Sequence, residues 1–376
     1  MRLLFVSNGY GEDLMAREII SRLPRGRLSM VAYPLVGLGE GYGGEVELLD
    51  PRRRLPSGGF ALRTWGEALL HDLRAGLVQF WREQLRTLRR LRGEVVLTVS
   101  IGDVYCLFMA AQAGAPVVFL PTAKSEYNER HRWLEILVVR RLSEVVFTRD
   151  EPTAMALRRH GIDARFVGNV MMDCLHFSGE DFGIPPGHAV VVLLPGSREE
   201  AKQNLSLMAK ACDILAREEQ EPPAFLCPIA PSFPATSLEE VARTLGGVWD
   251  PASSRLTFGK AEIRITRQFA DAINRATVVL GMAGTANEQA AGLGKPVVAF
   301  PGPGPQFTRG FLRLQGRLLG EALIPVESWE EAAEVISRLL RDEGERRRRG
   351  ETGKRRMGGA GGAAHVASYL LQRLGL

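Results

Sequence analysis

Two segments in the second half of the chain place small and polar residues where an apolar run gives way to a helical pattern. The first, from Val190 to Asn204, reads VVVLLPGSREEAKQN, and the second, from Val278 to Ala291, reads VVLGMAGTANEQAA. Glycines let a ligand approach the backbone, and the free amide groups of a helix start favour an anion. The two segments therefore predict two walls of a pocket for a nucleotide diphosphate.

The first segment carries the groups that suit a pyrophosphate. Gly196, Ser197 and Arg198 put backbone donors, a hydroxyl and a guanidinium at one helix start. A guanidinium and backbone amides bind phosphate oxygens better than they bind a neutral ligand. The chain has no GxxxxGK[ST] motif and no GxGxxG that follows a strand, so neither a Walker loop nor a dinucleotide fingerprint is predicted.

The second segment carries acceptors for a ribose. Gly284, Thr285 and Ala286 open a helix whose first turn contains Glu288 and Gln289. The side-chain oxygens of both residues can accept hydrogen bonds from ribose hydroxyls. A nucleotide-binding role is therefore expected for this helix start.

The composition is that of a globular protein of two ordinary domains. The chain has 376 residues, of which 45% are hydrophobic and 24% charged. Its four cysteines show no CxxC spacing, so we expect reduced thiols and neither a metal nor redox chemistry. The amino-terminal apolar run is too short for a signal peptide, and no stretch approaches the roughly 18 apolar residues of a membrane span. A cytoplasmic location is expected.

Short β-rich runs alternate with helical patterns along the whole chain, which predicts an α/β fold with two parallel sheets. Gly and Pro between Gly168 and Pro186 interrupt the pattern. We therefore expect one Rossmann-like domain over 1–172, rejoined by a helix at 360–376, and a second over 173–359. Parallel sheets bind ligands beyond the carboxyl ends of their strands, so the two sheets are expected to face a cleft. The expected strands are 3–6, 28–33, 95–99, 117–120, 144–147, 165–167, 189–194, 224–228, 262–265, 277–280 and 297–300.

Four segments together resemble lipid-A-disaccharide synthase and its close relatives, which are glycosyltransferases of the GT-B fold. They are SNGYGEDLMA, RFVGNVMMD, LLPGSREE and GTANEQAAGLGKPVVAF. The resemblance implies that the second domain holds a UDP-activated amino sugar as the donor. It further implies that a hydroxyl of a membrane glycolipid attacks the anomeric carbon with inversion and releases UDP. No cofactor other than the sugar nucleotide, and no metal, is implied.

The resemblance also assigns roles in the second domain. Arg198 matches the family's nucleotide-phosphate arginine. The family's ribose-binding glutamate precedes a proline by seven residues; counted back from Pro296 this place is Gln289, with Glu288 immediately before it, and either can hold the sugar. Phe269 lies in the region that covers the uracil ring, although a core phenylalanine is an equal alternative.

In the first domain the resemblance makes Asp103 the base that deprotonates the acceptor hydroxyl. Asp103 follows the expected strand 95–99, and its alternative role is to cap the next helix. Glu12 and Asp13 can instead be the acids of a helix start, and Lys124 can be a plain loop residue. The remaining wall, on the acceptor side, is expected from Asn8, Gly9, Gly11, Glu12, Asp13 and Lys124.

The net charge of +5 and the pI near 9.2 arise largely from arginine clusters. Between Phe60 and Leu91 apolar residues, including Trp65 and Trp81, recur at helical spacing beside arginines, and Arg130 to Arg141 repeats the combination. This pattern predicts either an interfacial helix on an anionic membrane or a helix packed on the core. The run from Arg346 to Arg356 is expected to be a solvated basic tail. No nucleic-acid module is recognised, and a homodimer stays open.

Two other functions compete with peripheral membrane glycosyl transfer. A UDP-sugar 2-epimerase shares this fold but needs a catalytic cluster of carboxylates and histidine, which the sequence alone does not assemble. None of the six histidines stands beside a nucleophile motif. The third alternative is a non-catalytic scaffold that binds nucleotide or lipid.

Overall fold

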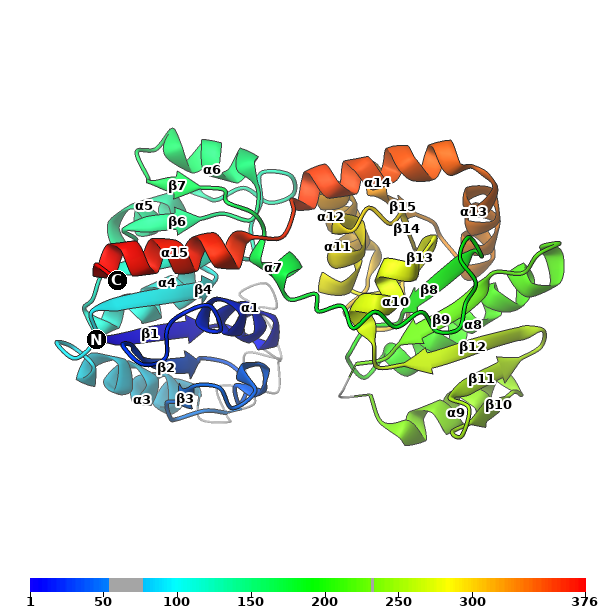
Figure 1. Ribbon diagram of the computed structural model, residues 1–376, viewed down its shortest axis with the longest axis horizontal. Helices are drawn as coiled ribbons and strands as arrows, with labels where there is room; N and C mark the ends of the chain where they lie inside the picture. Colours follow the sequence, from blue (N-terminus) through cyan, green and yellow to red (C-terminus); the bar gives the residue numbers. More distant parts are fainter. Residues whose placement is uncertain (54–76, 231–232) are drawn as a thin grey trace. The chain divides into compact units, whose positions relative to one another are not determined.

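The computed structural model describes residues 1–53, 77–230 and 233–376, and its contacts divide the chain into two compact units. Unit 1 comprises Met1–Cys174 and Gly359–Leu376, and unit 2 comprises Leu175–Gly358. Each unit is a sheet of mainly parallel strands with helices on both faces (Figure 1). The α/β fold class with two parallel sheets, predicted from the alternation of apolar runs and helical patterns, is confirmed.

The sheet of unit 1 has the order β3-β2-β1-β4-β5-β6-β7, and the strand pairs of its described part are all parallel. Its central strands are fully buried apolar runs because helices cover both faces. The strands are β1 (Arg2–Ser7), β2 (Ser29–Pro34), β3 (Glu47–Leu48), β4 (Leu97–Gly102), β5 (Val117–Pro121), β6 (Val145–Phe147) and β7 (Ala164–Arg165).

Alternate residues of each strand face opposite layers of unit 1. Leu3 and Phe5 of β1 belong to one core cluster, and Leu4 and Val6 belong to the other. The first cluster is covered by α1 (Tyr10–Ile20) and α15 (Gly362–Leu374). The second is covered by α3 (Leu77–Arg90), α4 (Val104–Ala110), α5 (Trp133–Leu142) and α6 (Glu151–Arg158).

The last helix, α15, returns to unit 1, as Figure 1 shows in red. Asp173, at the end of α7 (Val170–Asp173), accepts hydrogen bonds from the amides of Gly361 at 2.6 Å and Ala363 at 2.8 Å. A carboxylate at this helix start satisfies amides that would otherwise lack partners and opposes the positive end of the helix dipole. The final segment is thereby fixed to the first unit.

Helix α3 is a core helix over its described length. Phe80, Leu85 and Leu88 are buried in the second cluster, and Trp81 is partly buried against it. The apolar stripe formed by Phe80, Leu85 and Leu88 therefore packs on the sheet, and the interfacial alternative is wrong for this part of the helix. The expectation for Trp65 lies outside the described residues.

Unit 2 has the sheet order β10-β11-β12-β9-β8-β13-β14-β15. The strands from β12 to β15 are parallel, whereas β10 and β11 add an antiparallel extension that the sequence did not predict. The strands are β8 (Val190–Leu194), β9 (Ala224–Pro228), β10 (Val248–Asp250), β11 (Arg255–Phe258), β12 (Ala261–Thr266), β13 (Val278–Gly281), β14 (Val297–Ala299) and β15 (Leu323–Pro325).

The helices of unit 2 form two groups. One group, packed on the sheet from β10 to β14, is α8 (Ala201–Glu218), α9 (Ala235–Leu245) and α13 (Trp329–Arg341). The other group is α10 (Phe269–Arg275), α11 (Thr285–Gly292), α12 (Arg309–Leu319) and α14 (Glu343–Met357).

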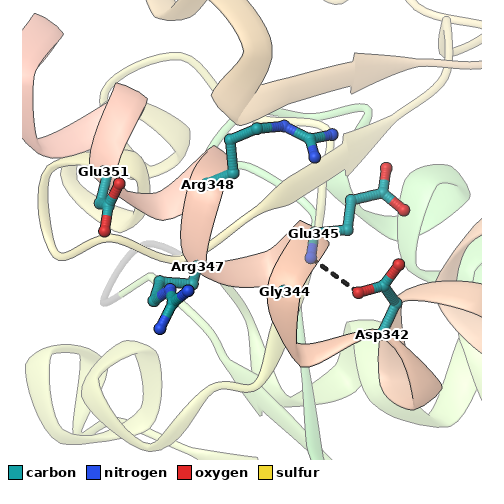
Figure 2. A pocket seen from close by; sticks show the side chains of 6 residues that line it. All are labelled: Asp342, Gly344, Glu345, Arg347, Arg348 and Glu351. Atoms are coloured by element: carbon teal, nitrogen blue, oxygen red, sulfur yellow. Dashed lines mark hydrogen bonds between the residues drawn. The ribbon is translucent and has the colours of Figure 1, made fainter.

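The arginine-rich run expected to be a solvated tail is instead helix α14. A methyl group on Gly353 would lie 2.3 Å from the carbonyl oxygen of Ala291, so the glycine is needed for the close approach of α14 to α11. Figure 2 shows a surface hollow at the start of α14, where Asp342 caps the Glu345 amide at 2.8 Å. The hollow is lined by the acids Asp342, Glu345 and Glu351 together with Arg347 and Arg348, so it selects neither sign of charge.

Candidate functional site

Three loops of unit 2 meet beyond the carboxyl ends of β8, β13 and β14, which are neighbours in the sheet. Gly196, after β8, has a positive φ of 98°, and a methyl group there would lie 3.4 Å from the carbonyl oxygen of Met282 after β13. A methyl group on Gly302, after β14, would lie 2.8 Å from Met282 Cε and 2.9 Å from Asn204 Oδ1. The two predicted nucleotide segments are therefore brought together, with the PGPGP loop beside them.

The start of α8 offers anion-binding groups. Ser197 and Arg198 are exposed, and no side chain caps the helix at Glu200. The buried Asn204 donates a hydrogen bond from Nδ2 to the carbonyl oxygen of Pro195 at 2.9 Å and so fixes the loop. Uncapped amides beside an exposed guanidinium suit a phosphate. The negative charges of Glu199 and Glu200 repel a phosphate, so the positive charge of Arg198 is needed to offset them.

The start of α11 also lacks a side-chain cap, with Gly284 at the N-cap position. Thr285 is exposed and Glu288, three residues later on the same side of the helix, is partly exposed. Gln289 is only 8% exposed and lies on the buried side. Of the two ribose candidates, Glu288 is thus the more accessible to a ligand. Ala286, in the first turn of the helix, is partly buried.

A buried amide pair that the sequence analysis missed holds this loop. Gln315 of α12 donates to the carbonyl oxygens of Ala283 at 3.1 Å and Gly284 at 3.0 Å, and accepts from Asn287 Nδ2 at 3.0 Å. Both side chains are buried, so these hydrogen bonds are shielded from water. The sequence signal that could have revealed this pair is Gln315, a single glutamine within the apolar pattern of α12. The pair holds the Ala283 and Gly284 carbonyls toward α12.

Phe269 is the first residue of α10, and its side chain is partly exposed. It follows β12, which lies two strands from β8 in the sheet. Asp271, two residues further along the same helix, accepts hydrogen bonds from Ser178 and Gly179. The partial exposure leaves a ring face available and does not match a fully buried core residue.

In unit 1 the carboxyl ends of β1, β4 and β5 are neighbours, and polar residues follow each of them. Asp103, directly after β4, caps α4 by accepting a hydrogen bond from the Cys106 amide at 2.9 Å. Burial raises the pKa of its carboxyl above the usual value, against that hydrogen bond, and the negative charge of Glu135 raises it further. Asp103 therefore does cap α4, as the alternative predicted. Its raised pKa also makes its carboxylate more basic than that of an ordinary aspartate.

Glu12, in the first turn of α1, lies close to Asp103. Its Oε1 accepts a hydrogen bond from Thr122 Oγ1, after β5, at 2.9 Å. Burial raises the pKa of Glu12, the hydrogen bond opposes this, and the charge of Asp103 raises it again. A methyl group on Gly9 would lie 3.0 Å from Glu12 Oε2, so this loop closes tightly over the carboxylate. Two acids from distant segments thus form one interacting pair.

Asp13 occupies a buried polar cluster beneath this pair. Ser7 Oγ donates to Asp13 Oδ1 at 2.6 Å, and the Ser7 and Tyr42 hydroxyls are 2.8 Å apart. Burial raises the pKa of Asp13 to about 7, despite the Ser7 hydrogen bond. Because its side chain is 2% exposed, Asp13 supports the loop and is not positioned to touch a ligand.

The other residues predicted on the acceptor side have structural surroundings. Asn8 is partly buried and its Oδ1 accepts no hydrogen bond in the described part of the chain, while Gly102 stands directly against it. Gly11 faces open space.

Lys124 is largely buried and forms ion pairs with Glu135 at 2.9 Å and Glu129 at 3.5 Å. The ammonium of Lys124 is therefore already engaged by carboxylates.

Glu135 and His131 extend the carboxylate pair toward α5. Burial alone would raise the pKa of Glu135, but hydrogen bonds from the Arg132 amide and Lys124 lower it. Burial lowers the pKa of His131, against the charge of Glu135. The sequence could not assemble a cluster of carboxylates and histidine; the fold brings Glu12, Asp103, Glu135 and His131 into one electrostatic neighbourhood.

Across the described residues no group of three or more His, Cys, Asp or Glu side chains is arranged to hold a metal ion. Cys106, Cys174, Cys212 and Cys227 are all free thiols. In the same part of the chain, no helix is long and apolar enough to span a membrane.

Solved structures with the same fold cover nearly the whole chain. The UDP-GlcNAc 2-epimerase of Neisseria meningitidis bound to UDP-GlcNAc has 14% identity and a TM-score of 0.61, with 99% of this chain and 100% of that chain covered. MnaA of S. aureus with UDP has 14% identity and a TM-score of 0.63, with 100% and 98% covered. The glycosyltransferase SnogD of Streptomyces nogalater has 17% identity and a TM-score of 0.57, with 99% of both chains covered.

These similarities establish the fold as GT-B, and identities this low establish nothing finer. A comparison with protein-family models finds no match, and none of the curated proteins matches the sequence. The predicted GT-B fold is thus confirmed. No lipid-A-disaccharide synthase is among the similar structures described above, so the chemistry has to be argued from the residues.

Proposed function

We propose that this chain is a UDP-sugar-dependent glycosyltransferase that transfers a sugar to a hydroxyl of a lipid-linked acceptor with inversion. The observation that carries the proposal is the pair of uncapped helix starts in unit 2, at Glu200 and Gly284, beside the exposed Arg198. Both follow neighbouring strands of a GT-B unit. Similar structures contain UDP or UDP-GlcNAc, which supports the same class of donor here.

In this reaction the acceptor oxygen forms a bond to the anomeric carbon while the bond from that carbon to the diphosphate breaks. The acceptor proton passes to a carboxylate, for which we propose Asp103, because its raised pKa makes it a stronger base than an ordinary aspartate. UDP leaves with the bonding electrons, and Arg198 with the helix amides stabilises the charge that develops on the diphosphate. No metal is required in this scheme.

A UDP-sugar 2-epimerase is the second candidate, and a specific observation favours it. An epimerase must remove the proton at C2 and return it on the other face, so it needs several groups that exchange protons. Glu12 and Asp103, with raised pKa values, and His131, with a lowered one, supply such groups. Several of the similar structures are also 2-epimerases. A scaffold without catalysis is the third candidate.

One experiment separates the three candidates. The protein is incubated with UDP-GlcNAc, with and without a bacterial lipid extract, and both the nucleotide and lipid products are analysed. Transfer predicts UDP release and a glycosylated lipid only when lipid is present. Epimerisation predicts an isomeric UDP-sugar without lipid, and a scaffold predicts binding of UDP without turnover.

The base is tested with Asp103→Asn. Asparagine is as good an N-cap as aspartate but is not basic, so α4 stays capped. We expect turnover to fall about a hundredfold while the Kd for UDP stays within about twofold. Asp150→Asn is the matched control, because Asp150 caps α6 in the same way, with Thr153 N at 2.8 Å. Equal turnover of Asp103→Asn and wild type would exclude Asp103 as the base.

A further inference from the structure

The outward face of α5 is unusually apolar for a surface helix. Trp133 is 72% exposed, Leu134 55% and Leu137 54%. Steps of about 100° per residue put Arg140 and Arg141 on the same side as these three residues, and Val139, fully buried, on the core side. A surface helix normally turns its polar face to water, so an exposed face with three large apolar residues indicates an interaction site.

The charges on this face have one sign. Arg140 and Arg141 are exposed, and neither forms an ion pair with another residue in the described ranges. The acid of the helix, Glu135, projects to another side and is held by Lys124 at 2.9 Å. Arg132, which precedes the helix, is also exposed. The partner must therefore have a negatively charged surface that covers an apolar interior.

A shallow hollow of about 530 Å³ adjoins the apolar side chains. Trp133 and Leu137 line one part of it, and Arg140, Arg159 and His160 line another. Two guanidiniums beside an indole and a leucine match the boundary between phosphate head groups and acyl chains, where tryptophan is favoured and arginine attracts anionic lipid.

We propose that the outward face of α5 docks on an anionic lipid bilayer, with Trp133, Leu134 and Leu137 in the interface and Arg140, Arg141 and Arg159 against lipid phosphates. The choice of a bilayer rests on the proposed function, since a lipid-linked acceptor is found there. It also fits the site, because Glu135 of α5 interacts electrostatically with Asp103.

The proposal is tested by co-sedimentation of the intact protein with vesicles of phosphatidylcholine, with and without phosphatidylglycerol. Binding should require phosphatidylglycerol and should decrease as salt rises, because surface charge is screened within roughly 8 Å at physiological salt. Removing one arginine should weaken binding about fivefold, so Arg140→Glu with Arg141→Glu, which removes two and reverses their charge, should weaken it at least about twenty-five-fold. Trp133→Ser with Leu137→Ser should weaken it at least as much.

Matched variants control for exposure and for charge. Val248→Ser removes an apolar side chain that is 64% exposed in unit 2, and Arg347→Glu reverses an exposed arginine there. Both should bind vesicles like wild type, and all variants should keep the wild-type affinity for UDP. Equal binding to both kinds of vesicle, or unchanged binding of Trp133→Ser with Leu137→Ser, would overturn the proposal. So would a dimer in solution that these two substitutions convert to a monomer, because a second copy would then cover the face.

The assay contains no sugar nucleotide, so its result does not depend on catalysis. Failure of the wild-type protein to bind anionic vesicles contradicts the docking surface and says nothing against sugar transfer. Failure of transfer by a protein that binds vesicles contradicts the proposed function instead.

Discussion

At the scale of single residues, Arg198 is the strongest positive group at the proposed phosphate site. It is exposed beside the uncapped start of α8, where Glu199 and Glu200 would otherwise repel a diphosphate. We expect Arg198→Ala to lose about 2 kcal/mol of transition-state stabilisation, which is roughly a thirtyfold fall in kcat/KM. Arg198→Lys should recover part of it. Arg243→Ala, at an exposed arginine of α9, serves as the control, and an equal effect of both would point to bulk charge.

The ribose assignment is also decided by single side chains. Glu288 is partly exposed next to Thr285, and Gln289 is 8% exposed. We therefore expect Glu288→Ala to weaken UDP binding about tenfold or more, as for a hydrogen bond to a charged group, and Gln289→Ala to weaken it less. Calorimetric titration with UDP measures both. The opposite ranking would return the ribose to Gln289, where counting from Pro296 put it.

What the sequence could and could not predict about the site follows from distance along the chain. Arg198 and the two glycine-bearing loops are local motifs, and local motifs are readable. The interaction of Glu12 with Asp103, and of Asp103 with Glu135, joins segments that are far apart in sequence. No periodicity encodes such an approach, because it is set by the order β1-β4-β5 of the sheet.

At the scale of elements, the buried parallel strands were the most predictable feature. The expected strands 117–120 and 224–228 correspond to β5 (Val117–Pro121) and β9 (Ala224–Pro228). Their apolar runs are continuous because both faces are covered. The antiparallel β10 and β11 were missed since only Leu256 among their residues is buried. The helix pattern of α3 was read correctly, but exposure cannot be read from a stripe of apolar residues alone.

The packing of α14 on α11 leads to a prediction about an element. A methyl group on Gly353 would lie 2.3 Å from the Ala291 carbonyl oxygen, so Gly353→Ala must push the helices apart. We expect it to destabilise unit 2 by about 1–3 kcal/mol and to weaken UDP binding, because α11 carries the ribose candidates. Gly316→Ala is the control, since its methyl group would meet only Leu323 Cδ2, at 3.8 Å. Denaturant unfolding compares the two, and equal stabilities would show that α14 is loosely attached.

At the scale of the whole molecule, each unit has its own core and its own polar edge. Unit 2 carries the loops that suit a diphosphate, and unit 1 carries carboxylates and an apolar, basic helix face. This separation explains why Glu288→Ala is expected to change nucleotide affinity and Arg198→Ala to change kcat/KM, while Asp103→Asn should change turnover alone. It also makes a single free energy of unfolding poorly defined, so stability is best followed in each unit separately.

The buried Asp13 gives unit 1 a dependence on pH that can be followed in this way. Its pKa is raised from 3.8 to about 7 in the folded state, so the folded form binds the proton more tightly than the unfolded form. This contribution to stability is complete below about pH 4 and is lost as pH rises toward 7, to a total of at most about 4 kcal/mol. Asparagine keeps the neutral form, so Asp13→Asn should match wild type at low pH and exceed it at pH above 7. Amide hydrogen exchange in β1 and α1 measures the difference, and β8 and α8 of unit 2 are the internal control. A difference that does not grow with pH would mean that Asp13 is ionised in the folded protein.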